Sequence, residues 1–274
     1  MEAGLLFDPL FRLPLLVGAV LAVLLPVLGV LLRLRNEWLA ALGLAHLAAA
    51  SGLGGLAVGI PAVLGAPLGA LVGALIKTLL GGRGNTAYAL MILAGWSATM
   101  LIAANTALGS AIGHALTEGQ LFLAGRVQLM AALVLATVAA LALPWLLPRL
   151  VRARLFPRQE RANRLPAWRW HLSFDLLVAL AMAVGTGTVG LMAAFALAFV
   201  PPWLAFRLAP SWSLTLGFSV AAGLAAYLLA FALALYLDQP LGPTLVAVLG
   251  IGAGVAEFVR RRAAHRWSRS SKGA

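Results

Sequence analysis

The sequence has no cysteine and few charged residues, and each shortage excludes a class of protein. Without Cys among its 274 residues, the chain has no disulfides, thiolate metal sites or cysteine nucleophiles. Charged residues make up only 10% of the chain. The phosphate-binding pattern Gly-x-x-x-x-Gly-Lys-Ser/Thr is also missing, so this chain is not itself a P-loop ATPase. We expect no enzymatic activity and no cofactor.

Apolar residues dominate what remains. They fill 62% of the positions, and the mean hydropathy is +0.99. A soluble domain cannot bury this much apolar surface, whereas a bilayer removes that limit and each spanning helix needs about 20 apolar residues. The composition predicts an all-α, polytopic membrane protein with eight or nine spans, forming a single transmembrane domain over 1–274.

Breaks in the apolar runs place nine spans along the chain. The boundaries Ser51 to Pro61 and Gly185 to Gly190 are the two uncertain divisions, and the second predicts a hairpin of two short helices. The predicted spans are 14–33, 37–55, 59–80, 87–109, 128–148, 170–186, 189–206, 213–236 and 242–259.

The basic residues favour the hairpin. With nine spans, the N-terminus lies outside and the C-terminus in the cytoplasm, and only Arg12 and Arg126 of the twenty basic residues lie outside. This distribution predicts a multi-pass protein of a bacterial inner membrane with a basic cytoplasmic tail over 260–274. The net charge of +12 then reflects basic residues that collect on the cytoplasmic side and contact anionic membrane lipid, or that dock an acidic partner. It does not indicate binding to nucleic acid.

Few polar side chains lie at membrane depth. His46, in the middle of the second span, either contacts a substrate cation or bonds to a neighbouring helix. Asp175 and Glu257 are expected to reach the cytoplasmic interface or to pair with nearby arginines. His114 and Glu118, four residues apart in an external loop, are possible cation contacts, with a solvated loop as the alternative.

Glycines spaced by four residues predict close helix packing. Gly65, Gly69 and Gly73 share one face of the third span, and Gly250 and Gly254 share a face of the ninth. Small residues at this spacing let helix backbones approach closely in a bilayer.

Three segments resemble the permease subunits of ABC importers for zinc, manganese or iron. The first is the turn Val184 to Gly190, with Gly185, Gly187 and Gly190, followed by a helix that ends near Pro201. The second, between the last two spans, is Asp238-Gln239-Pro240-Leu241-Gly242-Pro243-Thr244, and the third is the short external element Gly119-Gln120-Leu121. The similarity covers about Arg35 to Gly250.

The resemblance implies a pore that alternates its access under the action of a separate ATPase. It further implies an extracytoplasmic substrate-binding protein and a homodimer of this chain. His46 matches the histidine of the family's Asp-x-x-x-His pair and is the metal ligand that the resemblance implies, but Leu42 replaces the aspartate and Trp96 a second histidine. The cytoplasmic loop that would contact the ATPase carries Arg158, Arg161 and Arg164.

These departures leave two alternatives to a metal importer. The first is a divergent ABC permease that imports a non-metal substrate, or a subunit that does not transport. The second is a secondary carrier that needs no partner. The lack of paired acids at membrane depth argues against proton coupling in such a carrier.

Overall fold

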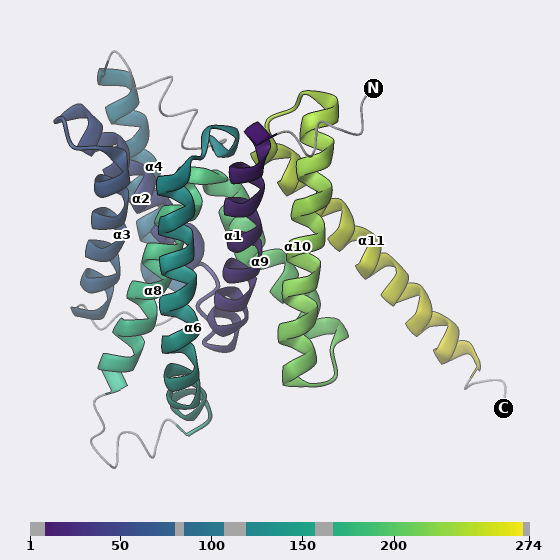
Figure 1. Cartoon of the computed structure of the whole chain (residues 1–274). Helices are drawn as coiled ribbons and strands as arrows, with labels where there is room; N and C mark the ends of the chain where they lie inside the picture. The colour runs from purple at the N-terminus through teal and green to yellow at the C-terminus, as the bar shows by residue number, and fades with distance from the viewer. Residues whose placement is uncertain (1–8, 80–84, 107–118, 157–166, 271–274) are drawn as a thin grey trace.

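The computed structural model describes residues 9–79, 85–106, 119–156 and 167–270, and these parts form a bundle of nine long helices (Figure 1). All nine are long and apolar enough to cross a membrane. A short 3-10 helix, η2 (Leu121–Leu123), precedes α6. The long helices are α1 (Pro9–Leu34), α2 (Ala40–Ala57), α3 (Ala62–Leu79), α4 (Asn85–Asn105), α6 (Arg126–Leu155), α8 (Ala167–Thr188), α9 (Leu191–Leu208), α10 (Trp212–Leu237) and α11 (Leu241–Ser270). The prediction of an all-α membrane protein is confirmed.

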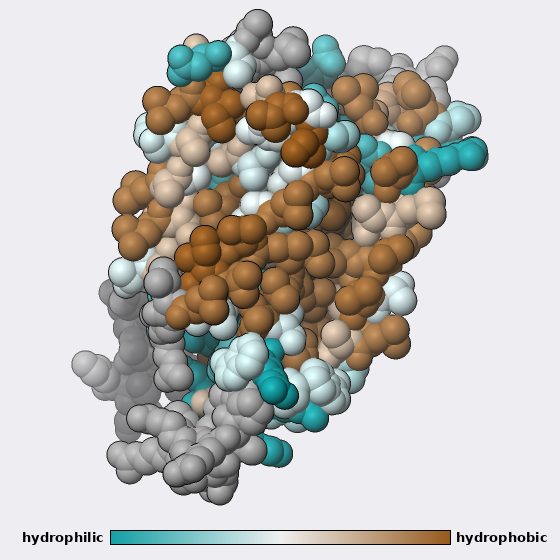
Figure 2. All heavy atoms as spheres, turned by 90° about the vertical axis from the view of Figure 1, so that its left-hand side faces the viewer, coloured by the Kyte–Doolittle hydropathy of each residue, from teal (hydrophilic) through white to brown (hydrophobic). Residues whose placement is uncertain are grey.

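The helices divide into an inner and an outer group. In α1, α2, α8 and α9, between 56% and 67% of the most apolar segment is buried, against 17% to 33% in the other five. The outer helices therefore turn most of their apolar side chains away from the bundle, and a broad hydrophobic band covers the face drawn in Figure 2. Such a surface suits lipid rather than water.

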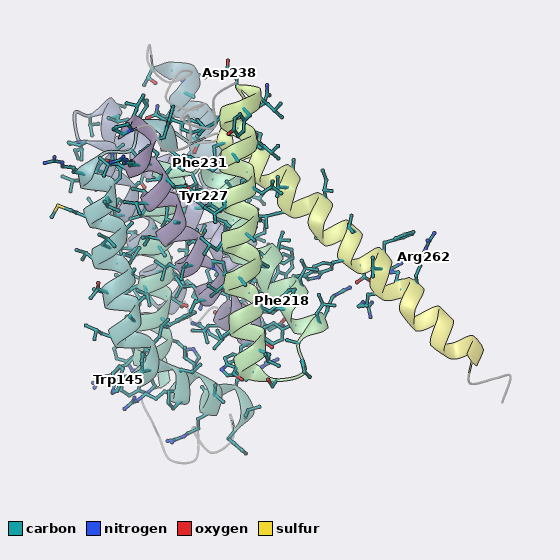
Figure 3. All side chains as sticks on the ribbon, turned by 45° about the vertical axis from the view of Figure 1, so that its right-hand side comes forward. Trp145, Phe218, Tyr227, Phe231, Asp238 and Arg262 are labelled. Atoms are coloured by element: carbon teal, nitrogen blue, oxygen red, sulfur yellow. The ribbon has the colours of Figure 1, made fainter. Side chains whose placement is uncertain are left out.

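In Figure 1, α1 begins at the upper side of the bundle and α11 ends toward the lower side. We use these two names for the ends of the bundle. In its first turns, the last helix buries Leu241, Leu245 and Leu249, which share one face. Beyond them α11 leaves the bundle at an angle toward Arg262 (Figure 3).

The predicted hairpin is present between α8 and α9. The reversal occurs at Val189 and Gly190, and among the three glycines of this segment only Gly190 has a positive φ, at 96°. Gly185 and Gly187 were expected in the turn but lie in the last turns of α8. The glycine that folds the chain back is thus the last of the three, because its backbone conformation is one that L residues rarely adopt.

The predicted close packing at the glycine stripes is found on α3 but not on α11. On α3, a Cβ added at Gly69 would clash with Ser51 of α2, and one at Gly73 with Leu47 of α2, so this stripe does permit close packing. On α11, nothing lies within 4 Å of such a Cβ at Gly250 or Gly254. Within this chain the prediction of close packing at the second stripe is wrong, because α11 diverges from its neighbours there.

Candidate transport pathway and ion quartet

His46 lies half-buried in the middle of α2, as expected for a span. Its Nδ1 is 2.9 Å from the carbonyl oxygen of Leu42, one turn earlier. Because a carbonyl can only accept, Nδ1 must carry the proton in this bond. Nε2 is then left with a free lone pair, which is the form of imidazole that binds a metal ion.

A glycine of α4 brings that helix against His46. A Cβ added at Gly95 would lie 2.7 Å from the carbonyl carbon of His46 and 2.8 Å from its Cβ. The two helices can be this close only because position 95 has no side chain. The next residue, Trp96, is exposed, and Leu42 is half-buried one turn from His46 on the same face of α2.

Aromatic side chains lie on the other flank of α2, where it contacts α9. Trp38, just before α2, packs on Phe199 with ring centroids 5.5 Å apart, and Phe195 stacks on Phe199 at 5.4 Å. Among the described residues, no three His, Asp or Glu side chains are grouped closely enough to hold a metal ion. In the described part of one chain, His46 therefore has no complete set of candidate metal ligands around it.

Four charged side chains meet at the lower side of the bundle, and we call Arg35, Glu37, Lys77 and Asp175 the ion quartet. Arg35 and Glu37 come from the turn between α1 and α2, Lys77 from the last turn of α3, and Asp175 from α8. Arg35 donates to Asp175 Oδ1 at 2.8 Å and pairs with Glu37 at 2.6 Å. Lys77 donates to Asp175 Oδ2 at 2.7 Å and to Glu37 at 3.2 Å.

The quartet is neutral and closed to solvent. Its side chains are between 1% and 8% exposed. Two fully buried rings line it, with the Arg35 guanidinium 5.0 Å from the Phe174 ring and Lys77 Nζ 5.2 Å from the Tyr88 ring. Burial lowers the pKa of Arg35, but the carboxylates beside it outweigh burial and raise that pKa above its ordinary value. Each charge thus has a direct partner, as burial requires.

The quartet differs from the sequence-based expectations. Asp175 pairs with an arginine, as one alternative held, but it is buried rather than at the interface and shares Lys77 as a second partner. Arg35 and Lys77 were counted as basic residues of cytoplasmic segments, whereas both are buried. Sequence reasoning missed Glu37, because its partner Lys77 lies 40 residues away and Asp175 lies 98 residues beyond Lys77, and such separations leave no local pattern.

Glu257 pairs with nearby arginines, as one of the two alternatives for it held. This carboxylate of α11 accepts from Arg207 of α9 at 2.8 Å and from Arg260 and Arg261 of its own helix at 2.9 Å. The Arg207 guanidinium also lies 4.2 Å from the Trp203 ring. The contacts tie the diverging part of α11 to the lower end of α9.

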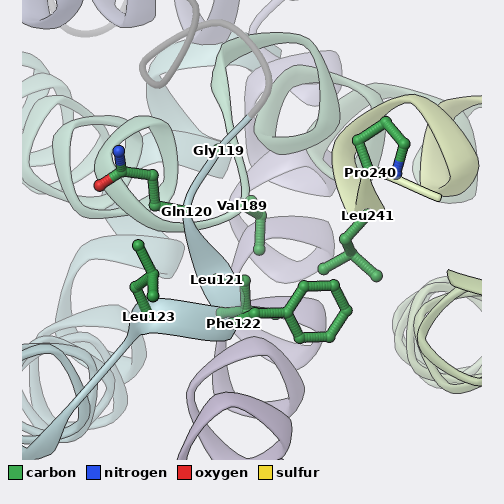
Figure 4. Close-up of a pocket in the computed structure, with 8 residues that line it drawn as sticks. All are labelled: Gly119, Gln120, Leu121, Phe122, Leu123, Val189, Pro240 and Leu241. Carbon is green, nitrogen blue, oxygen red and sulfur yellow. The ribbon is translucent and has the colours of Figure 1, made fainter. Parts of the chain in front are cut away.

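At the upper side, the three segments that resemble the permease family come together. They line a cavity of about 220 Å³, with Val189 from the hairpin, Pro240 and Leu241 from the α10–α11 turn, and the segment 119–123 between them (Figure 4). The amide of Gln120 donates to the carbonyl of Thr188 at 2.8 Å. Gly119 has a φ of 85°, and a Cβ there would lie 2.3 Å from the Val189 carbonyl carbon. A side chain at position 119 would push these segments apart.

The remaining motif residues have structural positions. Asp238 ends α10 in the left-handed conformation, with a φ of 51°, and Pro240 immediately precedes α11. Gly242 and Pro243 lie in the first turn of α11, where a missing backbone N–H leaves no helical bond unmade. Pro201 is buried inside α9.

Five predicted contact residues cannot be placed, because they lie outside the residues that the structure describes. They are the external pair His114 and Glu118 and the loop arginines Arg158, Arg161 and Arg164.

In the described residues, nine apolar helices, a tight hairpin at the upper side and a sealed charge cluster at the lower side define a polytopic membrane protein. A model of the ABC 3 transport family matches residues 8–257, so the chain belongs to this family. The expected resemblance is confirmed, and the chain is the pore subunit of an ABC importer. Comparison with curated proteins finds no relative.

Two solved structures share the fold. One is PsaBC from Streptococcus pneumoniae in complex with Fab, with a TM-score of 0.78, 16% sequence identity and 92% of both chains covered. The other is an inward-facing conformation of a transporter described as of the metal-chelate ABC type, with a TM-score of 0.70 and 15% identity. That comparison covers 90% of this chain and 85% of the other.

Proposed function

We propose that this chain imports a divalent transition-metal ion, zinc, manganese or iron, by alternating access driven by a separate ATPase. The observation that carries the proposal is His46, whose Nδ1 bonds to its own helix and whose Nε2 is left free to bind a metal. His46 is the only histidine in the middle of a predicted span. Imidazole suits zinc and iron, which is consistent with the family.

A homodimer would supply what one chain lacks. One imidazole is too few ligands for a transition metal, which takes four or more. His46 and Leu42 lie on a half-exposed face of α2, so a second copy placed against this face would bring a second imidazole. Water or a group carried by the substrate would complete the coordination.

The partners follow from the same proposal. An ABC ATPase would contact the lower side through the loop with Arg158, Arg161 and Arg164, and an extracytoplasmic substrate-binding protein would contact the upper side. The chain would lie in a bacterial inner membrane with its N-terminus outside and its C-terminus in the cytoplasm. The excess of basic residues toward the lower side supports this orientation.

One observation favours a second candidate function, the import of a non-metal substrate or a non-transporting role. The residue one turn before His46 is Leu42, and on the other flank of α2 Trp38 packs on Phe199. Apolar side chains offer a bare dication no ligand, and removing its water without replacement is costly.

ATPase stimulation separates the two candidates. The chain would be reconstituted with its ATPase and binding protein, and ATP hydrolysis measured with Zn²⁺, Mn²⁺ and Fe²⁺ in turn. A metal importer predicts stimulation by one of these ions, its loss in His46→Ala and its retention in the control Thr137→Ala, an exposed position on α6. Absence of stimulation by all three ions in the wild-type complex would reject the metal proposal in favour of the second candidate.

A further inference from the structure

The ion quartet stands between two regions that the proposed function requires to communicate. Asp175 is its only member from α8, and α8 begins at Ala167, directly after the loop expected to contact the ATPase. Eight residues of helix separate Ala167 from Asp175, a distance of about 12 Å. A displacement of the loop by the ATPase would therefore reach Asp175 along little more than two helical turns.

The quartet is also joined to α2, which carries His46, and to α4, which packs against α2 at His46. Glu37 lies in the turn before α2, and His46 is six residues into that helix, or about 9 Å from its start. The same turn is fastened to α4, because Asn85 accepts from the Leu39 amide at 3.0 Å and donates to the Asn36 carbonyl at 3.3 Å. The close contact between α2 and α4 at His46 follows farther up.

We propose that Asp175 is a positioning residue that couples the ATPase-facing end of α8 to the helices around His46. Its two oxygens bind different elements, Oδ1 the turn through Arg35 and Oδ2 the end of α3 through Lys77. The proposal rests on the proposed function, because it assumes an ATPase at the lower side.

Burial gives the connection its stiffness. In an apolar site between aromatic rings, a charge that loses its partner is left unpaired and unsolvated, so the four side chains move together. An exposed set of the same charges would yield by taking up water. The quartet therefore transmits a displacement of α8 rather than absorbing it.

A charge-balanced double variant tests coupling separately from folding. Neutralising Asp175 alone would leave two buried cations sharing the single carboxylate of Glu37, whereas Lys77→Met with Asp175→Asn removes one charge of each sign. The Arg35–Glu37 pair then remains, at 2.6 Å. The control is Ser173→Ala, an exposed position two residues before Asp175 on α8.

In the reconstituted complex with ATPase and binding protein, we expect the double variant to retain the ATPase and hydrolyse ATP. The binding protein should no longer stimulate hydrolysis above about the basal rate, whereas Ser173→Ala should be stimulated like the wild type. Full stimulation in the double variant would overturn the proposal and leave the quartet a purely structural role.

A distance measurement on the unaltered quartet keeps the test valid if the double variant does not fold. Because the chain has no cysteine, spin labels can be attached at Thr78→Cys on α3 and Ser173→Cys on α8 without other changes. Coupling predicts the same distance distribution in the nucleotide-free and the ATP–vanadate state, since the two helix ends move as one body. A clear shift between these states would contradict it.

Failure of the proposed function is recognised separately. If no ATPase co-purifies with the wild-type chain, the ABC assignment of partners fails before either readout is taken. If the ATPase co-purifies and is stimulated, but the double variant is stimulated equally, only the role of Asp175 is refuted.

Discussion

The contact between Gly95 and His46 allows a sharp test of how the pathway is built. In Gly95→Ala, the new methyl group would lie 2.7 Å from a backbone carbon of His46. Helices α2 and α4 would have to separate by roughly 0.8 Å to restore ordinary van der Waals contact. Overpacking of this kind costs about 1–3 kcal/mol.

A gain in helix propensity offsets part of that cost. Alanine is favoured over glycine in a helix by about 1 kcal/mol. The net loss of stability should therefore be about 1 kcal/mol for a clash in the middle of the stated range. The matched control is Gly54→Ala on α2, where the added Cβ meets only the end of the Ile102 side chain, at 3.4 Å. The control should be as stable as the wild type or slightly more stable.

The assay is the loss of helical signal as SDS is added to protein in mild detergent. Gly95→Ala should unfold at a lower SDS fraction than the wild type, and Gly54→Ala should not. The reconstituted Gly95→Ala complex should also lose metal stimulation of the ATPase, because His46 is displaced, while the ATPase still binds. Equal stability of the two variants would refute the claim that the helices touch at Gly95.

The remaining predictions concern the quartet, the hairpin and the loop. Asp175→Asn leaves two buried cations with one carboxylate, and should lower the free energy of unfolding by about 3–5 kcal/mol, measured by the same SDS titration. Gly190→Ala forces an L residue into a backbone region that is nearly exclusive to glycine, and should lower the free energy of unfolding by about 1–3 kcal/mol. The control Gly187→Ala, at a helical position with open space, should not lower it, and equal losses in the two variants would contradict this. Replacing three loop arginines together by Gln should weaken ATPase docking, and undiminished co-purification would reject their role; they are Arg158, Arg161 and Arg164.

Much of the fold can be predicted from the sequence because the bilayer imposes simple rules on it. Spans need long apolar segments, and basic residues collect on one side, so the nine helices and their order follow from composition and charge. The exact point of reversal does not follow, because Gly185, Gly187 and Gly190 look alike in the sequence. Only the structure distinguishes the one with a positive φ.

The candidate site is predictable only in part. His46 stands out because it is isolated at depth, whereas the partners of Asp175 depend on the α1–α2 turn and the end of α3 meeting α8 at one point. Likewise, the glycines of α11 have the spacing of a packing motif, but α11 leaves its neighbours before the spacing could be used. Long-range geometry of this kind has no periodic signature in the chain.

Accessibility labelling of two single-cysteine variants tests the central claim, that α8 and α9 cross the membrane in opposite directions within a nine-helix bundle. The variants are Ser211→Cys, at an exposed position between α9 and α10, and Gln239→Cys, at an exposed position between α10 and α11. In intact cells, a membrane-impermeant maleimide should label Gln239→Cys, and should label Ser211→Cys only after the membrane is permeabilised. Labelling of Ser211→Cys in intact cells would contradict the hairpin, the number of spans and the proposed orientation.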